Sequence, residues 1–206
     1  MQQKNYERIL FVDIDGVFNK LFGQATNVNV GTIPGDYMDV DLVKFVARQL
    51  NQVKRDGQEV KVVGCSSWFS PSRPEKNTKL FSRIKNETGF DIVDVVNDTG
   101  GWVGRTKAVL DYVVEHKPLY WCVVDDGDYY HGQLYVNHVF FADKPYYNIR
   151  QNFVQVHGRY GMSNQDIEAM LSILGVSDWN RGIVNQRTIQ LDFEEELKRI
   201  SGDCNV

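Results

Sequence analysis

A short apolar run that leads into two aspartates constrains the fold of this chain more than any other feature. Residues Ile9 to Val12 contain no polar side chain, and Asp13, Asp15 and Gly16 follow directly. An unbroken apolar run of this length is typical of a strand that is buried on both faces of a parallel sheet. Gly16 permits the sharp turn with which such a strand leaves the sheet. The sequence therefore predicts a buried parallel strand with two carboxylates at its carboxyl end.

The two aspartates point to a cation or a chemical task. Like charges this close repel each other, and such pairs are tolerated mainly where they are needed. The alternatives are an ordinary turn and a calcium-binding loop. An EF-hand loop would have Glu at its twelfth position, but the twelfth residue from Asp13 is Gln24. We therefore favour a catalytic carboxylate pair, and an ordinary turn stays open as the alternative.

Strands and helices alternate along the chain. Apolar or β-branched runs predict further strands over residues 59–65, 90–96 and 119–124, and shorter ones over 133–141 and 153–156. Helical spacing of apolar residues predicts helices over 39–56, 71–86, 106–115, 163–174 and 193–200. This alternation indicates right-handed βαβ units. The predicted fold class is α/β, with a Rossmann-like parallel sheet flanked by helices.

The composition indicates one ordinary globular domain. The chain has 206 residues, of which 42% are hydrophobic and 24% are charged. We predict a single domain over residues 1–206, with a catalytic core over about 8–143 and a C-terminal extension over about 144–206 packed on it. A formal net charge of -4 argues against a general nucleic-acid coat protein, but it permits a local basic patch.

The sequence also indicates a cytoplasmic location. Its three cysteines are far apart, so neither a disulfide framework nor a zinc motif is expected. Residues 1–7 are polar with no apolar segment behind them, and no apolar run approaches membrane-spanning length. We expect a cytoplasmic protein without a membrane partner, and the oligomeric state stays open.

Polar residues follow several of the predicted strands at the point where each strand ends. The carboxyl ends of parallel strands lie along one edge of the sheet, where catalytic groups gather. Each of these residues taken alone could also begin an ordinary turn. The residues expected at this edge are Asp13 and Asp15 after the first strand, Ser66 after the second, and Asp125 and Asp126 after the fourth.

Lys107 is a candidate anion-binding residue because it lies near the start of the predicted helix 106–115. A cation at this end opposes the helix dipole, whereas the backbone amides there already favour an anion. A lysine in this position therefore suggests a bound anion, and an ordinary solvated lysine is the alternative.

The order of these residues resembles the haloacid dehalogenase-like (HAD) hydrolases. The resemblance covers about residues 8–128 and includes all four family motifs in order. Residues 11–19 (FVDIDGVFN) and Ser66-Ser67-Trp68 are most similar to small HAD phosphatase domains, including those of RNA-repair proteins and phage genomes. The resemblance implies that Asp13 is a nucleophile that forms an aspartyl-phosphate, and that Asp15 is the general acid and base.

The resemblance also implies the remaining catalytic and metal-binding roles. Ser66 would hydrogen-bond a phosphate oxygen, and Lys107 would offset negative charge. A Mg²⁺ site would be formed by the Asp13 carboxylate, the Asp15 carbonyl and Asp125. Asp126 is the alternative or additional ligand.

Candidate substrate-binding residues lie in the same two motifs. They are Gly16, Asn19, Ser67 and Trp68. Trp68 could stack on a base or pack in the core. The basic segment 73–85 could follow a phosphate backbone or form a solvated helix face.

The spacing of the motifs favours an open site. The intervals 16–65 and 67–106 are filled by the predicted loop, helices and strands, so neither has room for a large cap domain. At most, the segment 20–37 would cover the site. We therefore expect a Mg²⁺-dependent phosphomonoesterase that acts on a nucleotide or a polynucleotide end. The alternatives are a phosphatase for small metabolites or phosphoproteins, and a catalytically idle binding module.

Overall fold

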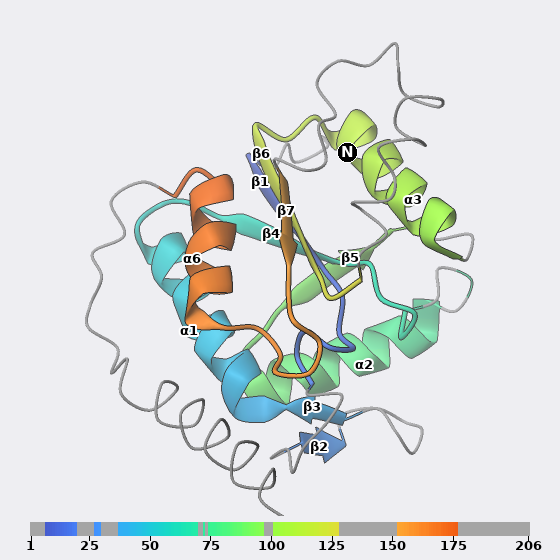
Figure 1. The fold of residues 1–206 in the computed structure, drawn as a ribbon, viewed down its shortest axis with the longest axis vertical. Coiled ribbons are helices and arrows are strands. Elements are labelled where there is room, and N and C mark those ends of the chain that lie inside the picture. Colours follow the sequence, from blue (N-terminus) through green and yellow to red (C-terminus); the bar gives the residue numbers. More distant parts are fainter. Residues whose placement is uncertain are drawn as a thin grey trace, which may run out of the picture.

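Five parallel strands form the central sheet of the protein (Figure 1). The computed structural model describes residues 7–19, 27–29, 37–69, 72, 74–96, 101–127 and 152–176. The sheet has the order β5-β4-β1-β6-β7, and every neighbouring pair is parallel. Its strands are β1 (Arg8–Val12), β4 (Val60–Gly64), β5 (Ile92–Val95), β6 (Tyr120–Asp125) and β7 (Phe153–Gln155). The predicted α/β class with a parallel sheet is confirmed.

Strand β1 lies in the middle of this sheet, and its residues from Ile9 to Val12 are apolar on both faces. All five of its residues are buried. Val12 is in register with Gly64 of β4 and with Val124 of β6, so the three strands end at one edge. The residues that follow these strands are therefore brought together.

The helices cover both faces of the sheet (Figure 1). Helices α1 (Val40–Arg55), α2 (Pro74–Thr88) and α6 (Asn164–Ile173) pack on one face, and α3 (Gly101–His116) packs on the other. Leu10 and Val12 belong to the first apolar layer, and Ile9 and Phe11 belong to the second. This alternation explains the unbroken apolar run, since both faces of β1 are covered.

Local caps fix the starts of two helices where the sequence predicted them. The Asp39 side chain accepts a hydrogen bond from the Leu42 backbone N–H, 3.1 Å away, at the start of α1. Ser163 and Asp166 form a capping box at the start of α6. Both caps satisfy backbone donors that the first helical turn leaves unpaired.

A small hairpin occupies part of the predicted flap. Strands β2 (Asn27–Asn29) and β3 (Tyr37–Asp39) pair antiparallel, and β3 leads directly into α1. The described residues between the first and second motifs form only this hairpin, α1 and β4, and those between the second and third form α2, β5 and part of α3. No large cap domain is found among the residues that the structure describes.

The fifth strand of the sheet comes from beyond residue 143, where we predicted the catalytic core to end. Val123 of β6 is in register with Phe153 of β7, and the Val156 backbone N–H donates to the Asp125 carbonyl at 2.9 Å. The predicted strand at 153–156 is therefore the outermost strand on this side of the sheet among the residues that the structure describes. The strand predicted at 133–141 and the helix predicted at 193–200 lie outside the described residues.

None of the helices in the described part of the chain combines the length and the apolar character that a bilayer span requires.

Candidate active site

The carboxyl edge of the sheet gathers acidic side chains from two neighbouring strands. The backbone N–H of Asp13 donates to the Val124 carbonyl at 3.0 Å, so the first residue after β1 is still held by β6. Asp125 is the last residue of β6. Both side chains are buried, with residue exposures of 5% for Asp13 and 0% for Asp125. Two carboxyl groups are thus held close together inside the protein, as the sequence predicted from the strand ends.

Asp126 completes a cluster that could hold a metal ion. Carboxylate oxygens of Asp13, Asp125 and Asp126 all lie within 4.8 Å of one another. A set of carboxylate oxygens is the ligand type that Mg²⁺ prefers. The cluster includes three of the four predicted metal-binding residues.

The cluster is electrostatically unfavourable in the absence of a cation. Burial, and then the negative charge of Asp125, raise the pKa of Asp13 from 3.8 to about 7. Arg105, the Ser66 side chain and the Ile14 backbone oppose this rise in pKa. Burial and the charge of Asp125 also raise the pKa of Asp126. A divalent cation would remove the repulsion, so the site fits the predicted Mg²⁺.

Gly16 allows the loop after β1 to pass close beside Asp126. The residue has a φ of +71°, in the left-handed region that favours glycine. A Cβ atom at this position would lie 2.0 Å from Oδ2 of Asp126. Gly16, which was predicted to bind substrate, therefore leaves free the space that the Asp126 carboxylate occupies.

Asp15 lies in the same loop and is held by two side chains. Its Oδ1 accepts a hydrogen bond from Nδ2 of Asn19 at 2.9 Å, and its Oδ2 accepts one from Nε1 of Trp68 at 3.0 Å. Asn19 in turn accepts the Gly16 backbone N–H at 2.7 Å. The Asp15 side chain is therefore held in a defined position beside the acidic cluster.

The Trp68 ring is buried in the core, whereas stacking on a base would require an exposed ring face. Trp68 is 9% exposed and belongs to the apolar core under the sheet. A buried ring has little free face for a base, so of the two alternatives core packing is the one observed. Asn19 is also buried and engages the loop around Asp15.

The turn after β4 places Ser66 at Asp13. Ser66 is buried, and its side chain hydrogen-bonds Asp13. The backbone N–H of Trp68 donates to Oγ of Ser66 at 3.3 Å. Ser67 is exposed. Ser66 therefore joins the acidic cluster as predicted from its strand end, and Ser67 faces the solvent.

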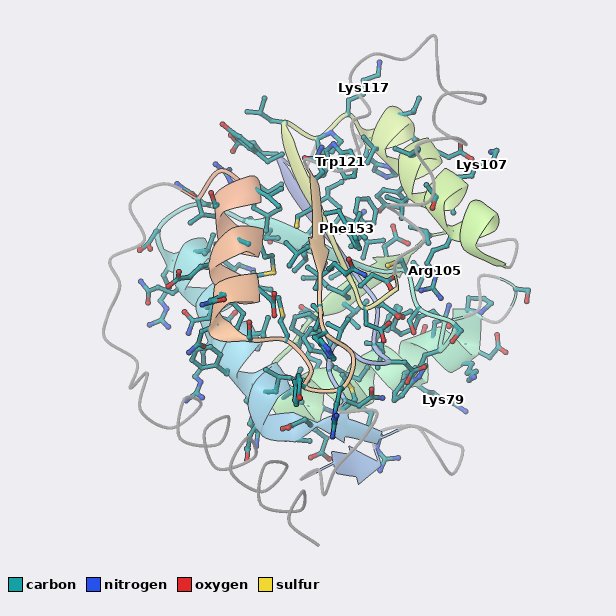
Figure 2. All side chains as sticks on the ribbon, viewed as in Figure 1. Lys79, Arg105, Lys107, Lys117, Trp121 and Phe153 are labelled. Atoms are coloured by element: carbon teal, nitrogen blue, oxygen red, sulfur yellow. The ribbon has the colours of Figure 1, made fainter. Side chains whose placement is uncertain are left out.

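Arg105, and not Lys107, is the cation that the structure places at the carboxylates. The Arg105 Nη1 lies 3.0 Å from Oδ2 of Asp125 and 3.4 Å from Oδ2 of Asp13, and its side chain is 15% exposed. The Lys107 side chain is 62% exposed and pairs with Asp111 one helical turn later. Figure 2 shows Arg105 directed toward the sheet and Lys107 on the outer side of α3.

Helix geometry explains this correction. Residues two positions apart on an α-helix differ by about 200°, so Arg105 and Lys107 cannot face the same side. Arg105 lies four residues before Val109, which is fully buried in the layer that α3 covers. Residues at i and i+4 share a helix face, so the four-residue spacing between Arg105 and the inward-facing Val109 was the sequence signal that could have identified Arg105.

The fold and the site together define the class. A parallel α/β sheet carries an Asp-x-Asp-Gly loop after its central strand, a serine after the next strand and an aspartate pair at the carboxyl end of β6, as in the HAD-like hydrolase domains. Residues 9–167 match the family model described as the HAD domain in Swiss Army Knife RNA repair proteins, and the chain belongs to this family. A comparison with curated proteins finds no match.

Proposed function

We propose that the protein is a Mg²⁺-dependent phosphomonoesterase that works through an aspartyl-phosphate on Asp13. The observation that carries this proposal is the cluster of Asp13, Asp125 and Asp126 with the Arg105 guanidinium beside two of its members. Phosphate monoesters carry negative charge, so a carboxylate can approach phosphorus only where cations cancel the repulsion. Electrostatic stabilisation of this kind is usually the largest catalytic contribution.

The metal would be held by the three carboxylates of the cluster, together with the Asp15 carbonyl. When bound, Mg²⁺ would supply positive charge at the phosphoryl oxygens and at the nucleophile. It would also favour the ionised form of Asp13, whose pKa of about 7 reflects burial and the neighbouring Asp125. Arg105, whose guanidinium lies beside Asp13 and Asp125, contributes in the same direction, in the role that the sequence suggested for Lys107.

The remaining residues handle the bonds and protons of the reaction. An oxygen of Asp13 attacks phosphorus in line while the bond to the ester oxygen breaks, and Asp15 gives its proton to that leaving oxygen. Asp15 then accepts a proton from a water molecule that attacks the aspartyl-phosphate. This second step releases inorganic phosphate and restores Asp13. Ser66, whose side chain already bonds Asp13, would donate to a phosphoryl oxygen.

A polynucleotide end or a nucleotide is the substrate class that we favour. The matched family is described as a domain of RNA repair proteins, and this description favours an RNA end or a nucleotide as the phosphorylated group. Helix α2 begins shortly after the Ser66 turn, and Lys76, Lys79 and Arg83 follow one another at intervals of three and four residues. Lys79 and Arg83 are exposed, and such a basic helix face can follow a phosphate backbone.

The test measures phosphate release from a generic aryl phosphate with Mg²⁺ and with a chelator. We expect metal-dependent release by the wild-type protein and none by Asp13→Asn. Asp111→Asn is the matched control, since this exposed aspartate pairs only with Lys107 among the ion pairs of the described residues. A following panel compares 5′- and 3′-phosphorylated RNA and DNA oligonucleotides, nucleotides, sugar phosphates and a phosphopeptide.

Each result has a clear consequence. Preference for oligonucleotides or nucleotides supports the substrate class, and preference for sugar phosphates or the phosphopeptide replaces it with the corresponding alternative. Release that persists in Asp13→Asn would contradict the mechanism. Failure with every member of the panel would contradict the phosphatase proposal and favour a binding module.

A further inference from the structure

The buried indole of Trp68 has one polar atom, and that atom is directed at Asp15. Nε1 of Trp68 donates to Oδ2 of Asp15 at 3.0 Å across a separation of 53 residues in the chain. A buried indole N–H normally finds an acceptor, because an unpaired donor is costly away from water. Here the acceptor is the carboxyl group that the proposed mechanism uses as its acid and base.

We propose that Trp68 is a positioning residue, whose indole N–H holds the Asp15 carboxyl in the orientation for proton transfer to the leaving oxygen. This inference rests on the proposed phosphatase function. Asn19 bonds the other oxygen of Asp15 at 2.9 Å, so donors from two different loops hold the two oxygens. One bond would still allow the carboxyl group to rotate, whereas two bonds from fixed groups define its plane.

The donation from Trp68 is compatible with both protonation states of Asp15. A carboxyl oxygen has two lone pairs, so Oδ2 or Oδ1 can accept one hydrogen bond and still carry or receive the transferred proton. The bonds from Trp68 and Asn19 occupy one acceptor site on each oxygen. The transferred proton can therefore leave or reach Asp15 only along the lone-pair directions that Trp68 and Asn19 do not occupy. This restriction is how the two donors would position Asp15 for proton transfer.

The indole can act in this way because its turn is rigid. The Trp68 backbone N–H donates to Oγ of Ser66, and the Phe69 backbone N–H donates to the Ser66 carbonyl at 3.1 Å. The Phe69 ring occupies the space above Gly64, where a Cβ atom would lie 2.3 Å from the ring. The ring of Trp68 packs in the apolar core at 9% exposure. The backbone contacts of the turn and the burial of the ring together restrain the direction of the indole N–H.

One short turn thereby serves two of the reacting groups. Ser66 bonds Asp13, the proposed nucleophile, and Trp68, two residues later, bonds Asp15. The side chains of the proposed nucleophile and of the proposed acid are thus both contacted by the segment that follows β4. Positioning of this kind matters because general acid catalysis requires the donor within hydrogen-bond reach of the leaving oxygen.

The decisive experiment compares Trp68→Phe with the wild-type protein on esters of different leaving groups. Phenylalanine keeps an aromatic ring in the core and removes the N–H donor. An alkyl phosphate needs a proton on its leaving oxygen, whereas 2,4-dinitrophenyl phosphate does not. We compare kcat/KM, because it reports phosphoryl transfer to Asp13 and excludes the later hydrolysis of the aspartyl-phosphate, which is the same for both esters. We expect kcat/KM for the alkyl ester to fall by about 10- to 100-fold, which is part of the roughly 10²- to 10⁴-fold that general acid catalysis contributes, and kcat/KM for the dinitrophenyl ester to change by less than about 3-fold.

Trp121→Phe is the matched control. Trp121 is similarly buried, at 6% exposure, but it packs on the other face of the sheet against Phe11. We expect this variant to retain the wild-type ratio of rates on the two esters. An equal loss of kcat/KM on both esters in Trp68→Phe, or no loss on either, would overturn the positioning role, because a purely structural defect does not depend on the leaving group.

A second measurement does not depend on activity. The chain has four tryptophans, and the indole signal that disappears from the ¹H–¹⁵N spectrum of Trp68→Phe is that of Trp68. We expect this signal to shift clearly in Asp15→Asn, in which Trp68 is retained, and to stay in place in Asp111→Asn. If none of the four indole signals shifts in Asp15→Asn, the inference is overturned, and this outcome needs no assignment and holds even where Trp68→Phe fails to fold. A wild-type protein that hydrolyses neither ester and no member of the panel above would overturn the proposed function, and the positioning role with it.

Discussion

Removal of the charge on Arg105 tests the most consequential contact of the site. Arg105→Met keeps a long side chain and deletes the guanidinium that lies 3.0 Å from Asp125 and 3.4 Å from Asp13. Lys107→Met is the matched variant, since Lys107 lies two residues later on α3 and pairs only with the exposed Asp111 among the described ion pairs. The two substitutions delete the same charge from opposite sides of one helix.

The expected magnitudes differ because the burial differs. At these distances and an effective dielectric constant of about 20, each attraction of Arg105 is about 5 kcal/mol before desolvation. Loss of one member of a buried ion pair typically costs about 3–5 kcal/mol of folding free energy. The exposed Lys107–Asp111 pair, spaced i and i+4, contributes only about 0.3–0.5 kcal/mol.

The Arg105→Met substitution should lower catalytic activity as well as stability. Arg105 opposes the rise in the pKa of Asp13, so its removal raises that pKa further and protonates more of the proposed nucleophile at pH 7. It also removes positive charge from the place where the phosphoryl group would bind. Loss of one such group typically lowers kcat by about 10²- to 10³-fold.

The assay combines thermal unfolding with chelator and steady-state hydrolysis of an aryl phosphate at saturating Mg²⁺. Arg105→Met should unfold at a clearly lower temperature and lose activity by the factor given above, and Arg105→Lys should fall between it and the wild type. Lys107→Met should stay within about 2-fold of wild-type activity, because a surface charge pair contributes little. A large loss in Lys107→Met together with near-normal activity in Arg105→Met would refute the assignment of Arg105 as the cation of the site.

Three further predictions follow from the same geometry. In chelator, the melting temperature should rise as the pH is lowered from about 7.5 to 5. The reason is that the folded-state pKa of Asp13 (about 7) exceeds its usual 3.8, so protonation of Asp13 stabilises the folded protein at low pH and this stabilisation is lost as the pH rises through 7. Addition of Mg²⁺ at pH 7.5 should restore the melting temperature. Gly16→Ala should weaken Mg²⁺ binding and destabilise the protein by about 1–3 kcal/mol, since its Cβ would meet Asp126 at 2.0 Å and its φ is positive; titration calorimetry and denaturant unfolding measure both effects. Gly64→Ala should cost about 1–3 kcal/mol in denaturant unfolding, because its Cβ would overlap the Phe69 ring.

Controls separate these effects from general damage. Asp13→Asn should lack much of the pH dependence between 5 and 7.5, and a full dependence in that variant would contradict the assignment to Asp13. Gly57→Ala serves as the reference for Gly16→Ala, since Gly57 also has a positive φ, +81°, but no atom lies within 4 Å of the added Cβ. Equal Mg²⁺ affinity in Gly16→Ala and Gly57→Ala would show that the close contact of Gly16 with Asp126 is not needed for metal binding. A Gly64→Ala protein as stable as the wild type would show that the close contact of Gly64 with the Phe69 ring does not affect stability.

The sequence alone determined the sheet and the acidic edge because both depend on local patterns. The apolar run before Asp13 is continuous where β1 is covered on both faces, and the polar residues begin where the strands end. Parallel pairing then places Asp13, Ser66 and Asp125 at one edge whatever the details of the loops. The motif order could therefore be interpreted before any contact was known.

Only the tertiary structure decided which neighbouring side chains complete the site. Arg105 and Lys107 are both basic residues near the start of one helix, and the choice between them depends on the rotation of α3 against the sheet. From the sequence, the Trp68 side chain could have stacked on a base or packed in the core, and its hydrogen bond to Asp15, 53 residues away in the chain, is seen only in the structure. These contacts join residues far apart in the chain through packing, and the local periodicity of a sequence contains no information on how a helix or a turn is rotated against its neighbours.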